Sequence, residues 1–112
     1  MSDCLFCKIV AGEIPADKVY EDELVVVFRD INPKAKVHLL IVPREHIVGL
    51  NELESEHGVL IGHIMGLIHA LAVDQGLESG YRTIINTGRD GGQEVFHLHI
   101  HLLGGRDLPG FG

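Results

Sequence analysis

Residues 97–103 read His-Leu-His-Ile-His-Leu-Leu, so histidines alternate with aliphatic residues over a full strand length. Successive side chains of a strand point to opposite faces of a sheet. The pattern therefore predicts a strand over Phe96–Leu103, with three imidazoles on one face and Leu98, Ile100 and Leu102 on the other. Stacked groups that can all become cationic oppose folding unless a ligand uses them. We expect one face of this strand in the core and the other in a functional site.

The rest of the chain predicts an α+β protein. Short turns between strands favour antiparallel pairing, and one long helix can cover one sheet face. We expect about five antiparallel strands, one long helix and a short N-terminal helix, all in a single domain over residues 1–112. The other expected elements are a short helix in Cys4–Val10, strands at Lys18–Glu21, Leu24–Phe28, Val37–Val42 and Tyr81–Asn86, and a long helix from an N-cap at Ser55 to about Gln75, closed by Gly76.

Charge and hydropathy exclude several classes of partner. The net charge is -7, from 9 basic and 16 acidic residues, which argues against binding a nucleic-acid duplex. A small anionic ligand stays compatible with that charge, because a few local donors suffice to hold it. The start, Met1-Ser2-Asp3-Cys4, has no signal-peptide pattern, so a cytoplasmic location is expected. The longest apolar stretch, Val59–Val73, falls short of the roughly 20 residues of a membrane span, so no membrane partner is expected.

The long helix carries a stripe of small residues at Gly58, Gly62, Gly66 and Ala70. Residues four apart share one face of a helix. Each interior glycine costs a helix about 1 kcal/mol relative to alanine, so the stripe needs a reason. Two reasons remain open, namely close packing on the chain's own sheet and close approach of a second copy in a homodimer.

A row of imidazoles suits two chemistries, metal coordination or attack on a phosphate group. The segment Asn86–Val95, upstream of the histidines, is rich in glycine. Its backbone N–H groups offer a cradle for phosphate oxygens. The loop and the histidines together favour phosphate chemistry.

The sequence resembles the histidine triad family. The resemblance rests on residues 97–103 and on four further segments, which are Gly91-Gly92-Gln93, Gly104-Gly105-Arg106, Asp30-Ile31-Asn32-Pro33 and His38-Leu-Leu-Ile-Val-Pro43. They are similar to the nucleotide-binding branch of that family, the purine nucleoside phosphoramidases. The likeness runs from about Cys4 to Arg106 and implies a HIT-like fold.

The resemblance also implies roles for individual residues. His99 would be the nucleophile, with His97 and His101 completing the triad and His38 supporting it. Asp30 would hold the ribose hydroxyls. The base would be enclosed by Leu5, Phe6, Ile9, Phe28 and Ile31, while Asn86, Gly92, Gln93 and Val95 would contact the phosphate and leaving group. Phe6, Phe28 and Ile31 are also residues that any fold would bury. Glu94 stands where many eukaryotic relatives carry Ser, and the sequence stops at Gly112, short of the longer tail that helps to shape the site in some relatives. The leaving-group preference therefore stays open.

Cys4 and Cys7 form a Cys-x-x-Cys pair, which is typical of a redox motif or of half a metal site. A redox pair belongs between a strand and a helix, a context absent here. Two histidines would complete a tetrahedral zinc site. Resemblance to the wider superfamily implies His46 and His97 as those partners, in which case His97 would be structural.

These observations predict a two-step phosphoramidase or nucleotidyl hydrolase. His99 attacks the α-phosphorus of an adenosine or guanosine 5′-phosphoramidate, an amine leaves, and water hydrolyses the nucleotidyl-histidine. No cofactor is required for this chemistry, although a structural zinc is expected at the Cys/His set. The alternative is a non-catalytic module that senses nucleotides or binds a metal through the triad.

Overall fold

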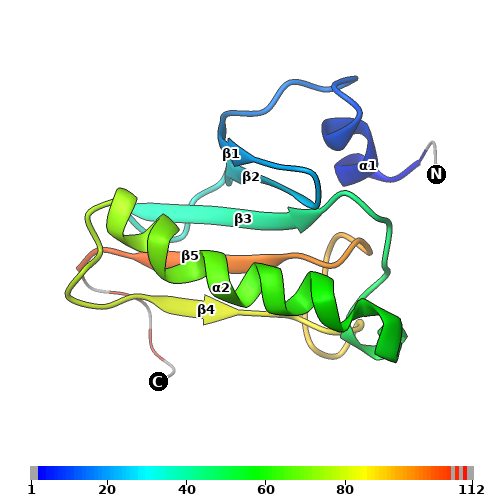
Figure 1. The fold of residues 1–112 in the computed structure, drawn as a ribbon. Helices are drawn as coiled ribbons and strands as arrows, with labels where there is room; N and C mark the ends of the chain where they lie inside the picture. The colour runs from blue at the N-terminus through cyan, green and yellow to red at the C-terminus, as the bar shows by residue number, and fades with distance from the viewer. Residues whose placement is uncertain (1–2, 107, 109, 111–112) are drawn as a thin grey trace.

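The computed structural model describes residues 3–106, 108 and 110. Within them, five strands form one antiparallel sheet in the order β1-β2-β3-β5-β4 (Figure 1). The sheet, one long helix and one short N-terminal helix confirm the expected α+β class. The elements are α1 Leu5–Val10, β1 Lys18–Glu21, β2 Val25–Arg29, β3 Val37–Pro43, the 3₁₀ turns η1 Leu50–Glu52 and η2 Ser55–His57, α2 Gly58–Asp74, β4 Arg82–Ile84 and β5 Ile100–Gly104.

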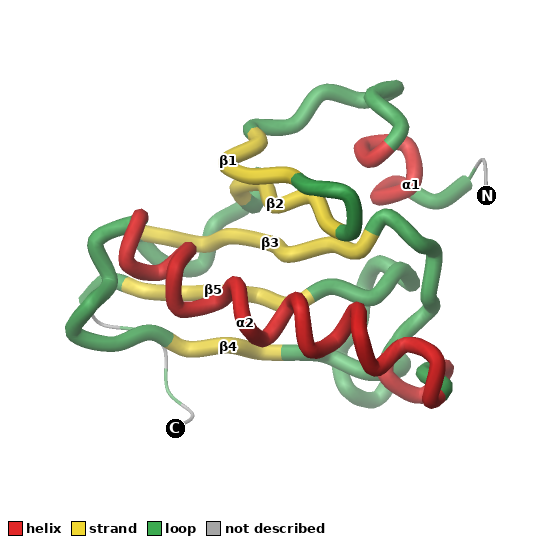
Figure 2. Tube along the Cα trace, viewed as in Figure 1, coloured by secondary structure: helices red, strands yellow, loops and turns green. Residues whose placement is uncertain are grey.

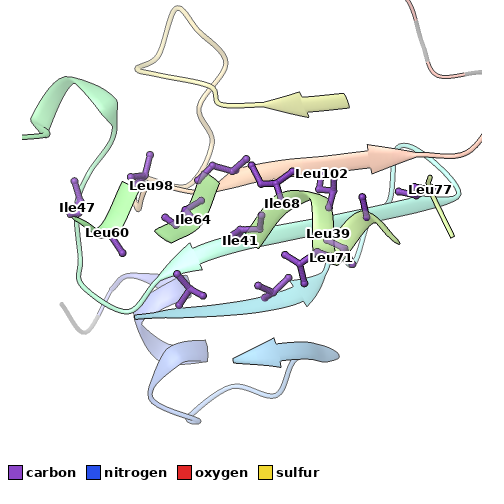
Figure 3. Packing of buried hydrophobic residues seen from close by; sticks show 14 residues of the cluster. Leu39, Ile41, Ile47, Leu60, Ile64, Ile68, Leu71, Leu77, Leu98 and Leu102 are labelled. Atoms are coloured by element: carbon purple, nitrogen blue, oxygen red, sulfur yellow. The ribbon is translucent and has the colours of Figure 1, made fainter. Parts of the chain in front are cut away.

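The long helix α2 covers one face of the sheet and builds the larger core. In Figure 3, its side chains Leu60, Ile64 and Ile68 point toward the strands. They meet Leu39 and Ile41 of β3 and other aliphatic residues of the same sheet face. The aliphatic half of the alternating segment also belongs to this core, since Leu98, Ile100 and Leu102 are each no more than 1% exposed.

The short helix α1 packs on the opposite face. Phe6 and Ile9 of α1 form a second cluster with Val26 and Phe28 of β2 and with β3 residues of the same parity. These strand residues alternate with those under α2, as the pleat requires. His38, which pairs with Leu103 in the register of β3 and β5, also faces the α1 side. The sheet therefore separates a core face from a histidine face.

Strand β5 is shorter than the expected Phe96–Leu103, because it begins at Ile100. Its partner β3 ends at Pro43, which has no N–H with which to extend the ladder. The N–H of Leu98 donates instead to the carbonyl of Ile47 at 2.6 Å. Strand β4 is likewise shorter than Tyr81–Asn86, because its last residue, Ile84, pairs with His101 next to the start of β5.

The α-helix begins at Gly58, not after an N-cap at Ser55. A 3₁₀ turn precedes it, and Glu54 caps that turn. The backbone N–H of Glu54 donates to Nδ1 of His57 at 2.9 Å, which closes a capping box with a histidine in the usual Glu position. The C-terminal end agrees with expectation, since Gly76 follows the helix with a φ of 79°.

The small-residue stripe of α2 faces away from the sheet. Gly58, Gly62, Gly66 and Ala70 are all exposed. A Cβ built on any of the three glycines would have no atom within 4 Å. Close packing on the chain's own sheet is therefore not the reason for the glycines, and the homodimer stays a prediction from the sequence. In such a homodimer the sequence also predicts that the N- and C-terminal segments approach the partner's site, and the end of the C-terminal segment lies largely outside the described residues.

Ser55–Asp74 is longer than the apolar stretch considered from sequence. It counts 20 residues with a mean hydropathy of 1.4, which is long and apolar enough to cross a membrane by length and composition. The stretch Val59–Val73 considered from sequence is shorter, so length alone does not exclude a membrane span for the whole helix. In this fold 28% of the apolar window is buried, and its buried side rests on the sheet through Leu60, Ile64, Ile68 and Leu71.

Candidate active site and metal centre

A cavity of about 990 Å³ opens on the histidine face of the sheet. Its lining residues come from α1, the end of β2, β3, β4, β5 and the loop after β4, elements that Figure 2 shows along the chain trace. Most side chains singled out from sequence line it. They are Leu5, Phe6, Ile9, Phe28, Asp30, Ile31, His38, Asn86, Gly92, Glu94, Val95, His99 and His101.

His99 is held in one tautomer by its own chain. Its Nδ1 lies 2.7 Å from the carbonyl oxygen of His97, and a carbonyl oxygen only accepts, so Nδ1 carries the proton. The lone pair is consequently on Nε2, and His99 lines the cavity. The ring is 7% exposed and packs edge-on against Phe6, with centroids 5.1 Å apart. An oriented imidazole with a free lone pair is an activated nucleophile.

A second hydrogen-bond chain fixes His38 and His101. The backbone N–H of Lys34 donates to Nδ1 of His38 at 3.0 Å, so the proton of His38 is on Nε2. That Nε2–H donates to Nδ1 of His101 at 2.9 Å. The remaining nitrogen of His101, Nε2, therefore carries a proton and is a donor beside the nucleophile, whose ring centroid is 5.0 Å away.

Burial keeps the supporting imidazoles neutral. Desolvation lowers the pKa of His101 to about 4, and the neighbouring imidazoles of His99 and His38 add to the effect. Desolvation also lowers the pKa of His38, although Asp30 opposes it. Neutral rings near pH 7 are what the hydrogen-bond chain requires, because an imidazolium cannot accept at Nδ1.

The apolar half of the cavity combines core and lining residues. Phe6 and Phe28 are each 4% exposed and meet edge to face with centroids 5.5 Å apart. They belong to the second core cluster and line the cavity as well. Ile31 differs, because it is 90% exposed at the cavity rim. The core interpretation therefore fails for Ile31, whose side chain is free to cover a ligand.

Asp30 lies at the junction between the apolar half and the histidines. Its Oδ1 accepts from the backbone N–H of Asn32 at 2.8 Å, which shapes the turn after β2. Its Oδ2 lies 3.5 Å from Nε2 of His38. Each carboxylate oxygen has two acceptor sites, so the group retains capacity for hydroxyl donors in the cavity that it lines.

The glycine-rich loop does not offer all the free N–H groups expected of it. Gly91, Gly92 and Gln93 each donate their backbone N–H to a carbonyl within the loop. The tight turn explains the glycines, since a Cβ on Gly91 would lie 2.3 Å from the carbonyl oxygen of Thr87 and Gly92 has a φ of 82°. These three N–H groups therefore shape the loop, and the cradle they were expected to form is absent.

Gln93 supports this loop and does not line the cavity. Its side chain is buried, with Nε2 donating to the carbonyls of Val48 at 2.7 Å and Val95 at 3.0 Å. Its Oε1 accepts from the backbone N–H of Gly88 at 2.9 Å. All of these partners are protein groups, so the amide holds the loop beside the cavity.

His97 is not among the residues that line the cavity and instead joins Cys4, Cys7 and His46. Its Nε2–H donates to the carbonyl of Pro43 at 2.8 Å, which leaves a lone pair on Nδ1. That Nδ1 lies 3.3 Å from Sγ of Cys4, 3.5 Å from Sγ of Cys7 and 3.2 Å from Nδ1 of His46. We call these four residues the Cys/His cluster, and their donor atoms all lie within 4.8 Å of one another.

The Cys/His cluster fits a tetrahedral zinc ion. With Zn–S of about 2.3 Å and Zn–N of about 2.05 Å, tetrahedral angles separate the ligands by about 3.3–3.8 Å. The contacts to His97 of 3.2–3.5 Å are close to that range. Burial, followed by the hydrogen bond to Cys4, raises the pKa of the Cys7 thiol to about 11. Both cysteines are free thiols, and a bound metal would displace their protons.

The sequence missed some contributors to the site. Arg82 and Ile84 of β4 line the cavity. Their register signals this, because Ile84 pairs with His101 and directly opposed residues share a face. The backbone N–H of Lys34 sets the tautomer of His38, and no side-chain pattern in the sequence predicts such a backbone contact. The three histidines outside both sites make hydrogen bonds with other side chains, His57 with Glu45, His63 with Asp22 and His69 with Tyr81.

Comparison with known proteins relates the whole chain to characterised relatives. It is 48% identical over 107 residues to the purine nucleoside phosphoramidase of Escherichia coli, covering 95% of this chain and 90% of that protein. It is 46% identical over 109 residues to the 14 kDa zinc-binding protein of Zea mays, covering 96% and 85%. A crystal structure of a HIT family hydrolase from Legionella pneumophila superposes with a TM-score of 0.92 at 48% identity, covering 96% of each chain.

The HIT domain description matches residues 11–108, which include His38, His99 and His101. The identities above extend over nearly the whole length of both chains in each pair. The triad pattern, the fold and the comparisons agree, and this chain is a member of the histidine triad (HIT) family of hydrolases.

Proposed function

We propose that this hydrolase is a purine nucleoside 5′-phosphoramidase that works through a nucleotidyl-histidine on His99. The carrying observation is the tautomer of His99, whose Nδ1–H is held by the His97 carbonyl so that the Nε2 lone pair is left for attack. A non-catalytic sensor has no need of an imidazole oriented in this way. The phosphoramidase at 48% identity supports the substrate class.

The reaction has two balanced steps. In the first, the Nε2 lone pair of His99 forms a bond to the α-phosphorus while the phosphorus–nitrogen bond breaks, and the amine leaves after taking a proton from solvent. The Nε2–H of His101 hydrogen-bonds the reacting group during this step. In the second, water attacks phosphorus and gives a proton back to solvent, the bond to Nε2 breaks, and a nucleoside monophosphate leaves.

The cavity matches the two ends of such a substrate. The purine lies between α1 and the β2 end, beneath Ile31, and the ribose hydroxyls donate to Asp30. The phosphate lies near His99, His101 and Asn86. Glu94 faces the leaving amine from the rim of the same cavity. Enclosure by apolar side chains accepts either purine, so adenine and guanine substrates are both expected.

A trapping experiment tests the covalent mechanism. Parent protein, mixed with an adenosine 5′-phosphoramidate and quenched, should carry one adenylyl group on a peptide that contains His99. His99→Ala should keep its fold and nucleotide binding but lose turnover and the adduct. Turnover at a normal rate by a folded His99→Ala protein would exclude this mechanism, and binding without turnover by the parent would favour the sensor.

We also propose a structural zinc at the Cys/His cluster, supported by the donor set and by the zinc-binding relative from maize. Zinc would tie α1 to the sheet and take no part in the phosphorus chemistry. Metal analysis of protein purified without chelator should give about one zinc per chain. The cytoplasmic location, the homodimer, and the lack of duplex and membrane partners stay predictions from the sequence.

A further inference from the structure

We infer that the Cys/His cluster positions the catalytic histidine, so that metal and nucleotide bind cooperatively. This inference rests on the proposed function, because it concerns the same nucleotide site. Both sites draw on helix α1 and its N-cap, since Cys4 and Cys7 belong to the cluster while Leu5, Phe6 and Ile9 line the cavity. Two separate connections join them.

The first connection runs through His97, whose side chain contacts the cluster and whose main chain contacts His99. The His97 ring donates from Nε2–H to the carbonyl of Pro43, and its Nδ1 belongs to the cluster. Its carbonyl oxygen accepts the proton of His99 Nδ1 at 2.7 Å. A metal at the cluster fixes His97 by one more bond, and the carbonyl that sets the tautomer of His99 is fixed with it.

The second connection is Phe6, which lies between the two cysteines in sequence. Its ring is edge-on to His97, with centroids 6.0 Å apart, and to His99, with centroids 5.1 Å apart. Helix α1 has only 6 residues. Helices shorter than about 12 residues are marginal in water, so α1 depends on tertiary contacts to stay in place. Thiol ligands on both sides of Phe6 would anchor that ring against the nucleophile.

The consequence is a reciprocal change in two affinities. If metal at the cluster orders His99 and the α1 wall, nucleotide binding need not order them again. Linkage then requires that zinc tightens nucleotide binding by the same factor by which the nucleotide tightens zinc binding. We expect a factor of at least about five, within the usual range of such couplings.

The test uses adenosine 5′-monophosphate and zinc with the full chain. Calorimetry gives the affinity for the nucleotide in zinc-loaded and chelator-treated protein. Competition with a chromophoric chelator gives the affinity for zinc with and without the nucleotide. Two equal factors of five or more support the inference. A factor near one, or no zinc binding by the parent, overturns it.

Two variants of helix α1 test whether the coupling depends on Phe6 or only on the general stability of the helix. Phe6→Leu keeps all four donors, so it should still bind zinc, but with a smaller coupling factor. Lys8→Ala on the same helix is the matched control and should leave the factor unchanged, because Lys8 belongs neither to the cluster nor to the cavity lining. An unchanged factor in Phe6→Leu would overturn the assignment to Phe6.

A spectroscopic measurement reports on His99 directly. In zinc-loaded protein, the ¹⁵N shifts of the His99 ring should show one tautomer with the proton on Nδ1. Chelator-treated protein should show a mixture, and identical spectra would contradict the inference. Adduct formation by chelator-treated protein would uphold the proposed function independently, because the coupling factor is measured by binding alone.

Discussion

Substitution of Gln93 tests whether its side chain stabilises the glycine-rich loop or contacts the phosphate. The sequence resemblance implies a contact with the phosphate, whereas the structure uses the whole amide to hold the loop. Gln93→Ala removes three hydrogen bonds and leaves the Val48 and Val95 carbonyls and the Gly88 N–H without this partner. Each net bond is worth about 0.5–1.5 kcal/mol, and an unsatisfied buried group costs more. We therefore expect a loss of about 2–4 kcal/mol in the free energy of unfolding.

Denaturant unfolding at one fixed protein concentration measures this loss, since a dimer's stability depends on concentration. Gln93→Glu keeps the size of the side chain but turns an oxygen toward two carbonyls, so it should also destabilise. Arg89→Ala is the control on the same loop, because the Arg89 side chain is 91% exposed. A Gln93→Ala protein of normal stability with weakened nucleotide binding would refute the reasoning and restore the phosphate contact.

Two further predictions concern Asp30 and pH. Asp30→Ala should weaken nucleoside binding by about 1.5–3 kcal/mol, the worth of a charge-assisted hydrogen bond; equal affinity of the parent for ribose and 2′-deoxyribose ligands, measured by calorimetry, would argue against this role. Because burial lowers the pKa of His38 and takes that of His101 to about 4, the unfolded chain binds more protons than the folded one between about pH 6.5 and 4. The free energy of unfolding should be highest above pH 6.5 and fall as the pH drops through this window. The fall should be smaller in His101→Asn. A denaturation midpoint that is equal at pH 7 and pH 5 in the parent would contradict the assignment.

The alternation of residues 97–103 predicted the two faces of the sheet correctly. Leu98, Ile100 and Leu102 are in the core, although the hydrogen-bonded strand begins only at Ile100. Burial enforces the parity, because a shift by one residue would put all three aliphatic side chains on the polar face. The start of the strand depends on Pro43 of another strand, and the local pattern contains no information about that partner.

The division of the triad between two sites is a tertiary effect of the same kind. His97 joins the cysteines, while His99 and His101 face the cavity. Spacing puts the three on one face but does not say which neighbours each ring meets. The role of the Gln93 side chain could not be predicted from the sequence either, because an amide next to glycines can contact a ligand or support a loop equally well. Only the positions of Val48 and Val95 decide between them.

The outer face of α2 leads to the prediction about assembly. Gly62 has no atom within 4 Å of a Cβ built on it. Val59 is 80% exposed and Met65 is 46% exposed on the same helix. Such an apolar face with room for close backbone approach suits a second copy of α2. We predict a homodimer with this helix near the two-fold axis, at twice the chain mass of 12.3 kDa.

Gly62→Leu then has opposite effects on the single chain and on the dimer. Within one chain the side chain meets nothing, and replacing a helical glycine should stabilise the helix by about 1 kcal/mol or less. Between two chains the same side chain overpacks the contact, at a cost of about 1–3 kcal/mol, which is roughly a five- to 150-fold weaker association. Light scattering over a dilution series should therefore show more monomer without loss of fold, and Gly62→Ala should show a smaller shift. A parent chain that is monomeric at micromolar concentration would overturn the assembly while leaving the chemistry of His99 untouched.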